Sequence, residues 1–128
     1  MANDFVHCEL STPNTDKAVA FYKKMFKWKI SKYPGMDYLG VNTGSKLSGG
    51  GIQKLPMPEA PTAWMPYVQV KDVKKSLEQA KKLGGKIIHP FQEVGDAGAI
   101  GIFLDPTGAC LGVYEKAKVK AKKKKARK

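Results

Sequence analysis

The chain has 128 residues, of which 42% are apolar, and its formal net charge is +12 at pH 7. A chain of this length can bury one hydrophobic core without disulfides or a structural metal, so the composition indicates an ordinary globular domain. Nine Lys and Arg residues and no acid lie in residues 116–128, which leaves 14 basic and 11 acidic side chains in residues 1–115. The positive charge is therefore a property of a tail.

The N-terminal segment MANDFVHCEL has no charged stretch followed by an apolar one, and no apolar run reaches membrane-spanning length. Cys8 and Cys110 are too few for a disulfide framework. We therefore expect a cytoplasmic protein with no membrane partner, in which both cysteines are reduced and partly buried.

The first half of the chain predicts one strand, one helix and three further strands. Residues 5–12 alternate in polarity, as a strand does, and Asn14 can cap a helix whose apolar residues recur at helical spacing. Turn signals at Pro34-Gly35 and at Asn42-Thr43-Gly44-Ser45 then separate strands near residues 27–33, 37–43 and 50–55.

A proline-rich linker over residues 56–62 cannot continue a strand ladder, and the same order of elements repeats after it. A strand at 63–70 precedes a helix that Asp72 caps and Gly84-Gly85 ends, and three strands follow near residues 86–91, 98–104 and 109–115. The sequence therefore predicts an α+β fold of two βαβββ modules, residues 1–55 and 63–115, followed by a disordered Lys-rich tail over residues 116–128.

Two such modules placed edge to edge form a curved, barrel-like mixed sheet with a central cleft. In the first strand, Val6, Cys8 and Leu10 share the parity that faces the helix, which turns His7, Glu9 and Ser11 toward the cleft. The same alternation turns cleftward the side chains of Met65, Tyr67, Cys110, Gly112 and Tyr114. The glycine-rich strand at residues 49–53 places Gln53 opposite Gly112.

The segments HCEL, AVAFYKKMFKW, VQVKDVKKSLEQAKKLGGKI and FLDPTGACLGVYE together resemble the vicinal oxygen chelate family. This family includes glyoxalase I, bleomycin-resistance proteins, fosfomycin-resistance enzymes and extradiol dioxygenases. The resemblance covers residues 5–115 and implies a glyoxalase-like pair of modules, often in a homodimer, and a small-molecule site in the cleft. The modules pair either within one chain or across the dimer.

Metal-dependent members of the family take ligands, usually His or Glu, from the first, fourth, fifth and eighth strands. The corresponding residues here are His7, Gln53, Met65 and Gly112, and only His7 is a strong ligand. We therefore expect no metal and no cofactor, with a displaced site made of His7, Glu9 and Gln53 as the alternative.

His7 and Glu9 are the candidate acid and base. The alternatives are that Glu9 or Tyr114 satisfies His7, and that Glu9 is a structural acceptor. The candidate substrate-binding residues are Gln53, Met65, Tyr67, Cys110 and Tyr114. Outside this set, we expect His89 to lie on the surface and Glu115 to be a solvated strand end. Five aromatic residues either stack on a planar ligand or belong to the core, namely Trp28, Tyr33, Tyr38, Trp64 and Phe103.

Two functions follow from these features. The first is a glyoxalase/bleomycin-resistance-like protein that binds or transforms a small organic molecule in the cleft. If it is an enzyme, the resemblance implies a lyase, isomerase or dioxygenase relative with a degenerate metal site. The second is a non-catalytic module that docks on nucleic acid or another polyanion through residues 116–128, without reading sequence.

Overall fold

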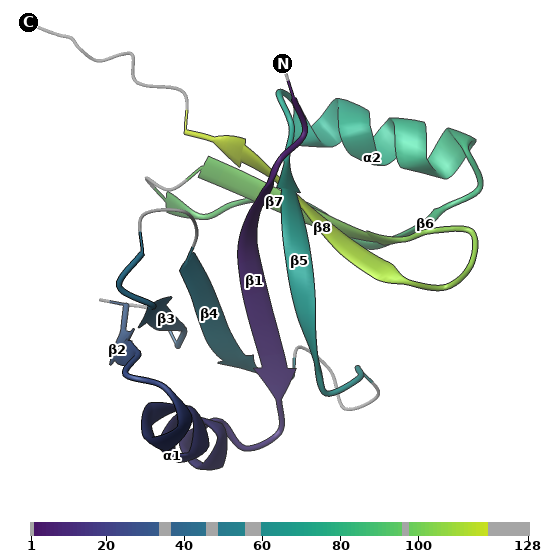
Figure 1. The fold of residues 1–128 in the computed structure, drawn as a ribbon. Coiled ribbons are helices and arrows are strands. Elements are labelled where there is room, and N and C mark those ends of the chain that lie inside the picture. Colours follow the sequence, from purple (N-terminus) through teal and green to yellow (C-terminus); the bar gives the residue numbers. More distant parts are fainter. Residues whose placement is uncertain (1, 34–36, 46–48, 56–59, 96–97, 118–128) are drawn as a thin grey trace, which may run out of the picture. The chain divides into compact units, whose positions relative to one another are not determined.

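Strands and helices follow one another in the predicted order. The computed structural model describes residues 2–33, 37–45, 49–55, 60–95 and 98–117. Its elements are β1 (Phe5–Thr12), α1 (Thr15–Met25), β2 (Lys29–Lys32), β3 (Leu39–Asn42), β4 (Gly49–Lys54), β5 (Ala63–Gln69), α2 (Val73–Lys82), β6 (Lys86–Glu93), β7 (Gly98–Leu104) and β8 (Cys110–Lys116). The predicted α+β class and the two βαβββ repeats are confirmed (Figure 1).

Three sequence predictions fall partly or wholly outside the described residues. They are the turn at Pro34-Gly35, the centre of the linker at residues 56–59 and the tail beyond residue 117. The two module boundaries and the cleft between the modules stay predictions.

The chain divides into two compact units, here called the N-terminal unit (residues 6–66) and the C-terminal unit (residues 1–5 and 67–128). In the N-terminal unit the strand order is β2-β3-β4-β1, with β1 and β4 parallel and the other neighbours antiparallel. In the C-terminal unit the order is β5-β8-β7-β6, with β5 and β8 as the parallel pair. Each unit therefore carries the same mixed-sheet connectivity.

Equivalent caps begin the two helices. The Asn14 side chain accepts a hydrogen bond from the N–H of Lys17 at 2.9 Å, and Asp72 accepts one from the N–H of Lys75 at 3.1 Å. Such caps satisfy backbone donors that a first helical turn leaves without intrahelical partners. Neither helix is long and apolar enough to cross a membrane, as far as the chain is described.

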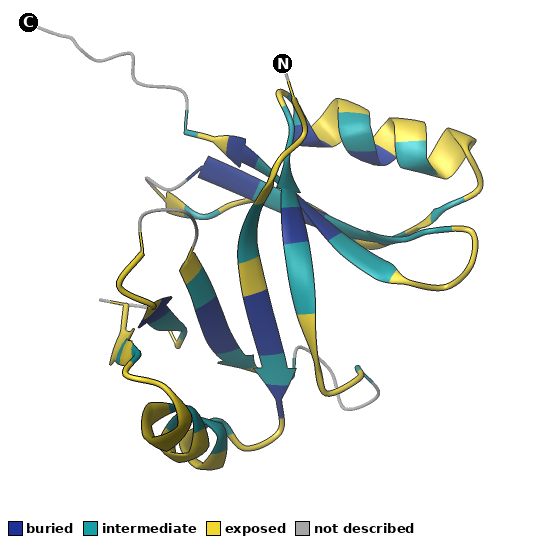
Figure 2. Ribbon diagram, in the orientation of Figure 1, coloured by how far each residue is buried: buried dark blue, intermediate teal, exposed yellow. Residues whose placement is uncertain are grey.

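The core of the N-terminal unit lies between α1 and its sheet. Leu10, Val41 and Ile52 are buried, and Ile52 is fully so. Figure 2 shows this burial along β1, β3 and β4, whereas no residue of α1 is buried. Half-buried neighbours complete the core, namely Ala18, Val19, Tyr22, Trp28, Ile30 and Leu39.

In the C-terminal unit, α2 packs on its sheet through Val73 and Leu77, which meet Val113 of β8. Gly101 of β7 permits this close approach, because a Cβ atom there would lie 2.7 Å from Cδ1 of Leu77. The close packing of α2 on its sheet therefore depends both on the apolar face of the helix and on the glycine at position 101 of the strand beneath it.

Glu115 is buried, which corrects the expectation of a solvated strand end. Its Oε1 atom accepts a hydrogen bond of 2.8 Å from the N–H of Val73, in the first turn of α2. The alternation of β8 directs Glu115 to the helix-facing side, where a backbone donor of α2 is within reach. Glu115 thus ties the last strand to the start of the second helix.

Replacing Glu115 with alanine is expected to lower the free energy of unfolding by roughly 1–3 kcal/mol, because the buried N–H of Val73 loses its acceptor. Urea denaturation measures the change. Glu93→Ala, at an exposed position of β6, is the matched control. Equal losses in the two variants would show that the carboxylate of Glu115 contributes nothing specific.

The segment Asp105-Pro106-Thr107-Gly108 is a structural turn between β7 and β8. One carboxylate oxygen of Asp105 accepts from the N–H and the hydroxyl of Thr107 and from the N–H of Ala109. The Thr107 hydroxyl, above all, lowers the pKa of Asp105, with further lowering from those backbone N–H groups. Gly108 adopts a φ of 99°, which favours glycine.

The structure also shows how far Cys8, Cys110 and His89 are exposed to solvent, and two of the three differ from the sequence prediction. Cys8 is exposed, and not partly buried, because α1 packs against β2 and β4 and leaves this part of β1 uncovered. Cys110 is half-buried, as expected. His89 is half-buried within β6, at an irregularity of the β6–β7 pairing beside Pro90.

Candidate functional site

The candidate site lies on the face of the N-terminal unit opposite its core. Along β1, Leu10 enters the core while His7 and Glu9 have the opposite parity. Along β4, Ile52 enters the core while Gln53 points the other way and reaches Glu9. Three of the predicted site residues, His7, Glu9 and Gln53, are therefore brought together.

A tyrosine immediately before β3, Tyr38, completes the group. The Tyr38 hydroxyl lies 2.8 Å from Nε2 of His7 and donates to Oε1 of Glu9 at 3.1 Å. Nε2 of Gln53 donates to the other oxygen, Oε2 of Glu9, at 2.8 Å. Glu9 is only 6% exposed, and both of its oxygens accept hydrogen bonds. This pattern suits an ionised carboxylate.

The hydrogen-bond directions fix the order of the group. When Glu9 is ionised, the single phenol proton of Tyr38 goes to Glu9, and in that state Nε2 of His7 is the donor toward the Tyr38 oxygen. The His7 and Tyr38 rings are also stacked, with 6.5 Å between centroids. The result is a directed chain from imidazole to phenol to carboxylate, which we call the His7–Tyr38–Glu9 relay.

Burial lowers the pKa of His7 from its ordinary value of 6.5, because desolvation disfavours the charged ring. The unfolded chain then binds the proton more readily than the folded chain. We expect His7 to leave the free energy of unfolding unchanged at pH values above 6.5 and to reduce it as the pH falls below that value.

Urea denaturation between pH 7.5 and pH 5 tests this expectation in the wild type and in His7→Gln, whose amide can still donate to Tyr38. The His7→Gln variant should lose less stability on acidification than the wild type. His89→Gln, which removes the chain's other histidine, is measured beside it as the matched variant. If the free energy of unfolding of His7→Gln fell with pH as steeply as that of the wild type, protonation of His7 would not be the cause of the loss.

Gly51 makes room for Tyr38. It lies beside Glu9 in the β1–β4 register, and a Cβ atom at residue 51 would come within 1.7 Å of the Tyr38 hydroxyl. Any side chain at this position would expel the phenol from the relay. The glycine-rich sequence of β4 is thus explained at this position by close approach of an aromatic ring.

The C-terminal unit repeats this arrangement with another tyrosine. Tyr67 pairs with Gly112, and a Cβ atom on Gly112 would lie 2.5 Å from the Tyr67 ring. Tyr67 is itself 2% exposed. The strand registers therefore make Gly51 the counterpart of Gly112 in the repeat, and Gln53 the counterpart of Tyr114. The placement of Gln53 opposite Gly112 stays a prediction.

The nitrogen and oxygen atoms of the relay are engaged in hydrogen bonds to one another. Glu9 uses both oxygens as acceptors, and Nε2 of His7 bonds to Tyr38. Within the described ranges, no three His, Cys, Asp or Glu side chains are grouped so that they could hold a metal ion. Zn²⁺ and similar ions need three or four such donors.

The remaining predicted site residues are placed as follows. Met65 is half-buried in the part of β5 that belongs to the N-terminal unit. Tyr67, Cys110 and Tyr114 lie in the C-terminal unit, and their approach to His7 stays a prediction.

Sequence reasoning grouped Tyr38 with four other aromatic residues and did not single it out. Trp28 and Phe103 pack against the two cores, and Tyr33 and Trp64 are 46% and 38% exposed. The signal that could have identified Tyr38 is the glycine at position 51, which has no side chain of its own to fill the space.

Comparison with known proteins gives a consistent result. The family model described as Glyoxalase/Bleomycin resistance protein/Dioxygenase superfamily matches residues 4–112. CFP32 of Mycobacterium bovis, a protein provisionally named a glyoxylase, is 30% identical over 113 residues, which are 84% of this chain and 43% of that protein. The chain thus spans less than half the length of the curated relatives it matches.

Among solved structures, methylmalonyl-CoA epimerase of Mycobacterium tuberculosis has a TM-score of 0.66 at 12% identity, covering 92% of this chain and 91% of its own. A variant of the Streptomyces coelicolor methylmalonyl-CoA epimerase in complex with 2-nitronate-propionyl-CoA has a TM-score of 0.62 at 9% identity, covering 91% and 99%. At these identities the likeness shows the fold alone.

Proposed function

Because the chain belongs to the Glyoxalase/Bleomycin resistance protein/Dioxygenase superfamily, we propose that it binds a small carbonyl compound at the His7–Tyr38–Glu9 relay and exchanges a proton on the adjacent carbon. The observation that carries the proposal is the directed hydrogen-bond chain that ends on a buried carboxylate. Proton exchange next to a carbonyl requires one positioned base and one group that returns the proton.

Tyr38 is the member of the relay that meets the substrate. Glu9 is buried and both of its oxygens are occupied, whereas Tyr38 is half-buried. In the proposed step the substrate C–H proton moves to the Tyr38 oxygen while the phenol proton moves to Oε1 of Glu9. The electron pair of the C–H bond stays on the substrate as an enolate, and the reverse transfers restore both groups.

His7 and Gln53 hold the relay in place during this step. The N–H of His7 donates to the Tyr38 oxygen and favours the charge that develops there, and the Gln53 amide fixes the other oxygen of Glu9.

The substrate class proposed first is the acyl thioesters. The support is the named activity of the methylmalonyl-CoA epimerases whose fold the chain shares, one of them bound to an acyl-CoA analogue. The provisional name of CFP32 also points to a carbonyl compound. The proposed activity is therefore that of an isomerase.

A thermal-shift screen of the full chain against acetyl-, propionyl- and methylmalonyl-CoA, with free CoA as the control, tests the binding part of the proposal. At least one thioester is expected to raise the melting temperature more than free CoA does, because a ligand that binds only the folded state stabilises it. If every thioester acts as free CoA does, the proposed substrate class is wrong.

The Lys-rich tail supports a second candidate function. Residues 116–128 contain nine basic residues and no acidic one, and such a segment binds polyanions through release of counterions. We expect binding to single-stranded DNA of any sequence that weakens steeply as salt rises and is lost when residues 116–128 are deleted. Filter binding measures it, and unchanged binding by the truncated chain would exclude this role for the tail.

Two further properties are proposed. The free thiols of Cys8 and Cys110 support a reducing, cytoplasmic location. The family resemblance supports a homodimer, which light scattering coupled to size-exclusion chromatography can test.

A further inference from the structure

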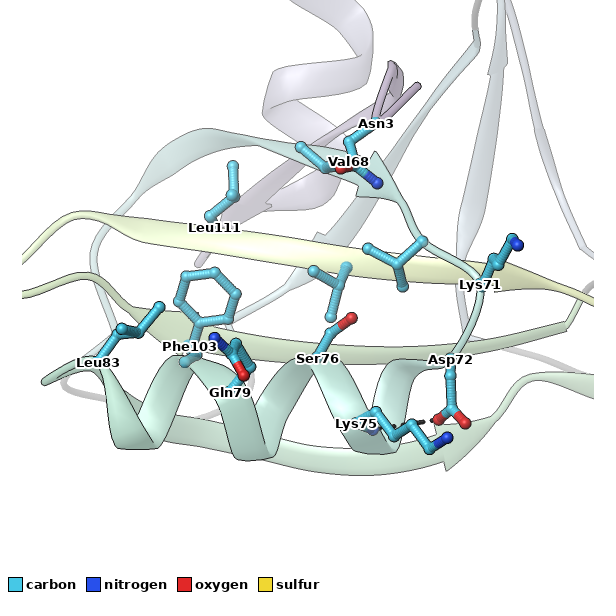
Figure 3. Close-up of a pocket in the computed structure, with 13 residues that line it drawn as sticks. Asn3, Val68, Lys71, Asp72, Lys75, Ser76, Gln79, Leu83, Phe103 and Leu111 are labelled. Carbon is cyan, nitrogen blue, oxygen red and sulfur yellow. Dashed lines mark hydrogen bonds between the residues drawn. The ribbon is translucent and has the colours of Figure 1, made fainter. Parts of the chain in front are cut away.

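The groove along α2 in the C-terminal unit is wide open to solvent, and the carboxylates at its charged end already have partners. Figure 3 shows Asp72 at the start of the helix, where it accepts the N–H of Lys75 at 3.1 Å. Glu115 accepts the N–H of Val73 in the same turn at 2.8 Å. Both carboxylates therefore cap the helix. The face of the N-terminal unit that carries the relay is built differently, around glycines.

Two glycines on neighbouring strands form a floor on this face. Gly40 of β3 pairs with Gly51 of β4, and Gly51 pairs in turn with Glu9 of β1. Directly paired residues project from the same face of a sheet, so the three positions form one row on the face of the relay. Because two of the three have no side chain, the row leaves room for groups from elsewhere in the unit.

Two tyrosine rings fill this room side by side. Tyr38 occupies the space over Gly51, and a Cβ atom on Gly40 would lie 2.6 Å from Cε1 of Tyr33. The centroids of the two rings are 5.5 Å apart at an interplanar angle of 63°, which is an edge-to-face contact. The N–H of Tyr33 also donates to the carbonyl oxygen of Tyr38 at 2.9 Å, so a backbone hydrogen bond fixes the spacing of the two residues.

The position of Tyr33 contributes little to stability by itself. Its side chain is 46% exposed, so it gains only part of what a core aromatic residue gains from burial. A glycine within a strand also weakens that strand, because it has no side chain to pack. The more specific effect of a ring held over Gly40 is therefore its contact with Tyr38.

We propose that Tyr33 is a positioning residue, whose ring over Gly40 holds the ring of Tyr38 in the orientation that the relay requires. The edge contact restricts rotation of the Tyr38 side chain, whose oxygen must meet both His7 and Glu9 at hydrogen-bond distance. The ring of Tyr33 makes this contact, so its hydroxyl is not required. The effect on catalysis rests on the proposed function, whereas the effect on the geometry of Tyr38 does not.

Long-range ¹H–¹⁵N NMR of the two histidine rings tests this geometry without any substrate. The Nε2 signal of His7 reports the hydrogen bond to Tyr38, and the signals of His89 are an internal reference. Tyr33→Ala should shift the Nε2 signal of His7 toward its position in Tyr38→Phe, which lacks the hydroxyl. Tyr33→Phe should leave that signal at its wild-type position, because the ring is kept.

A second variant displaces the ring of Tyr33 without altering it, and it also serves if Tyr33→Ala does not fold. Gly40→Ala places a methyl group in the space of the ring, within a regular strand, and should act as Tyr33→Ala does. Gly49→Ala, on the same face of β4, is the matched control. Its nearest described neighbour would be the carbonyl oxygen of Val41 at an ordinary 3.6 Å, so it should keep the wild-type signal of His7.

The proposed proton exchange gives a second readout. Tyr33→Ala and Gly40→Ala should each lower kcat by up to about a hundredfold, since misplacing a reacting group by about 1 Å can cost that much. KM should stay near the wild-type value, because a positioning residue acts through Tyr38 and not on the substrate. Tyr33→Phe should keep the wild-type kcat.

The proposal is overturned if Tyr33→Ala keeps the wild-type signal of His7, if Tyr33→Phe shifts it as far as alanine does, or if Gly40→Ala and Gly49→Ala behave alike. A raised KM at unchanged kcat in Tyr33→Ala would also overturn it, since Tyr33 would then be a substrate contact. If the wild type exchanges no proton, the proposed function fails, and the signal of His7 alone decides the role of Tyr33.

Discussion

Glu9→Gln is expected to lower kcat/KM for proton exchange on an acyl thioester by about 10²- to 10⁴-fold, the usual contribution of a positioned acid or base. The amide cannot take up the proton that Tyr38 passes on, although it has nearly the same shape. KM should change much less than kcat, because Glu9 is buried behind Tyr38 and does not itself meet the substrate. Steady-state kinetics on the purified variant separates the two constants.

Glu78→Gln is the matched control, since Glu78 is exposed on α2. It should keep the wild-type kcat and KM. Wild-type kcat in Glu9→Gln, with the fold intact by circular dichroism, would contradict the role given to the carboxylate and would leave Glu9 as a structural acceptor.

The largest effect on stability is expected from Ile52→Ala in β4. Ile52 is fully buried between Leu10, Val41 and the residues of α1 that pack on them, so its removal leaves a cavity. The free energy of unfolding should fall by about 2–5 kcal/mol. Since Ile52 lies between Gly51 and Gln53 in the same strand, exchange at the relay should fall as well.

Ile88→Ala is the control for this loss, because Ile88 is 38% exposed in β6. In urea denaturation, Ile88→Ala should lower the free energy of unfolding much less than Ile52→Ala does. Similar costs would mean that the buried cluster around Ile52 does not hold the N-terminal unit together.

The order of elements could be predicted because local signals mark each boundary. Asn14 and Asp72 are helix caps recognisable by residue type, and both accept the N–H three residues later. Alternation along β1 correctly separated Leu10 from His7 and Glu9. These features depend on neighbours in sequence, which is why they can be read without a structure.

The relay could be predicted only in part, because its central residue depends on contacts distant in sequence. Tyr38 reaches His7 and Glu9 only because Gly51, on the neighbouring strand β4, leaves space for the ring. The residues next to Tyr38 in the sequence do not indicate that its hydroxyl contacts His7 and Glu9. The equivalence of Gly51 with Gly112 likewise depends on register, which shifts if one strand slides by two residues.

Exposure was the other feature that the sequence could not determine. Cys8 has the helix-facing parity but is exposed, since the position of α1 over β2 and β4 is a matter of packing. Glu115 is charged and ends its strand but is buried, because the start of α2 supplies a donor. Parity gives the face on which a residue lies, and only the packed neighbours decide whether that face is covered.

Whether Tyr38 passes protons to Glu9 is tested most directly by uptake of solvent deuterium. Methylmalonyl-CoA in D₂O is incubated with the wild type and with Tyr38→Phe, and deuterium next to the thioester is measured by mass spectrometry against an enzyme-free blank. The relay predicts uptake above the blank with the wild type and uptake at the blank level with Tyr38→Phe, which keeps the ring over Gly51 but has no hydroxyl. Equal uptake by the two proteins, or none above the blank with either, would contradict it.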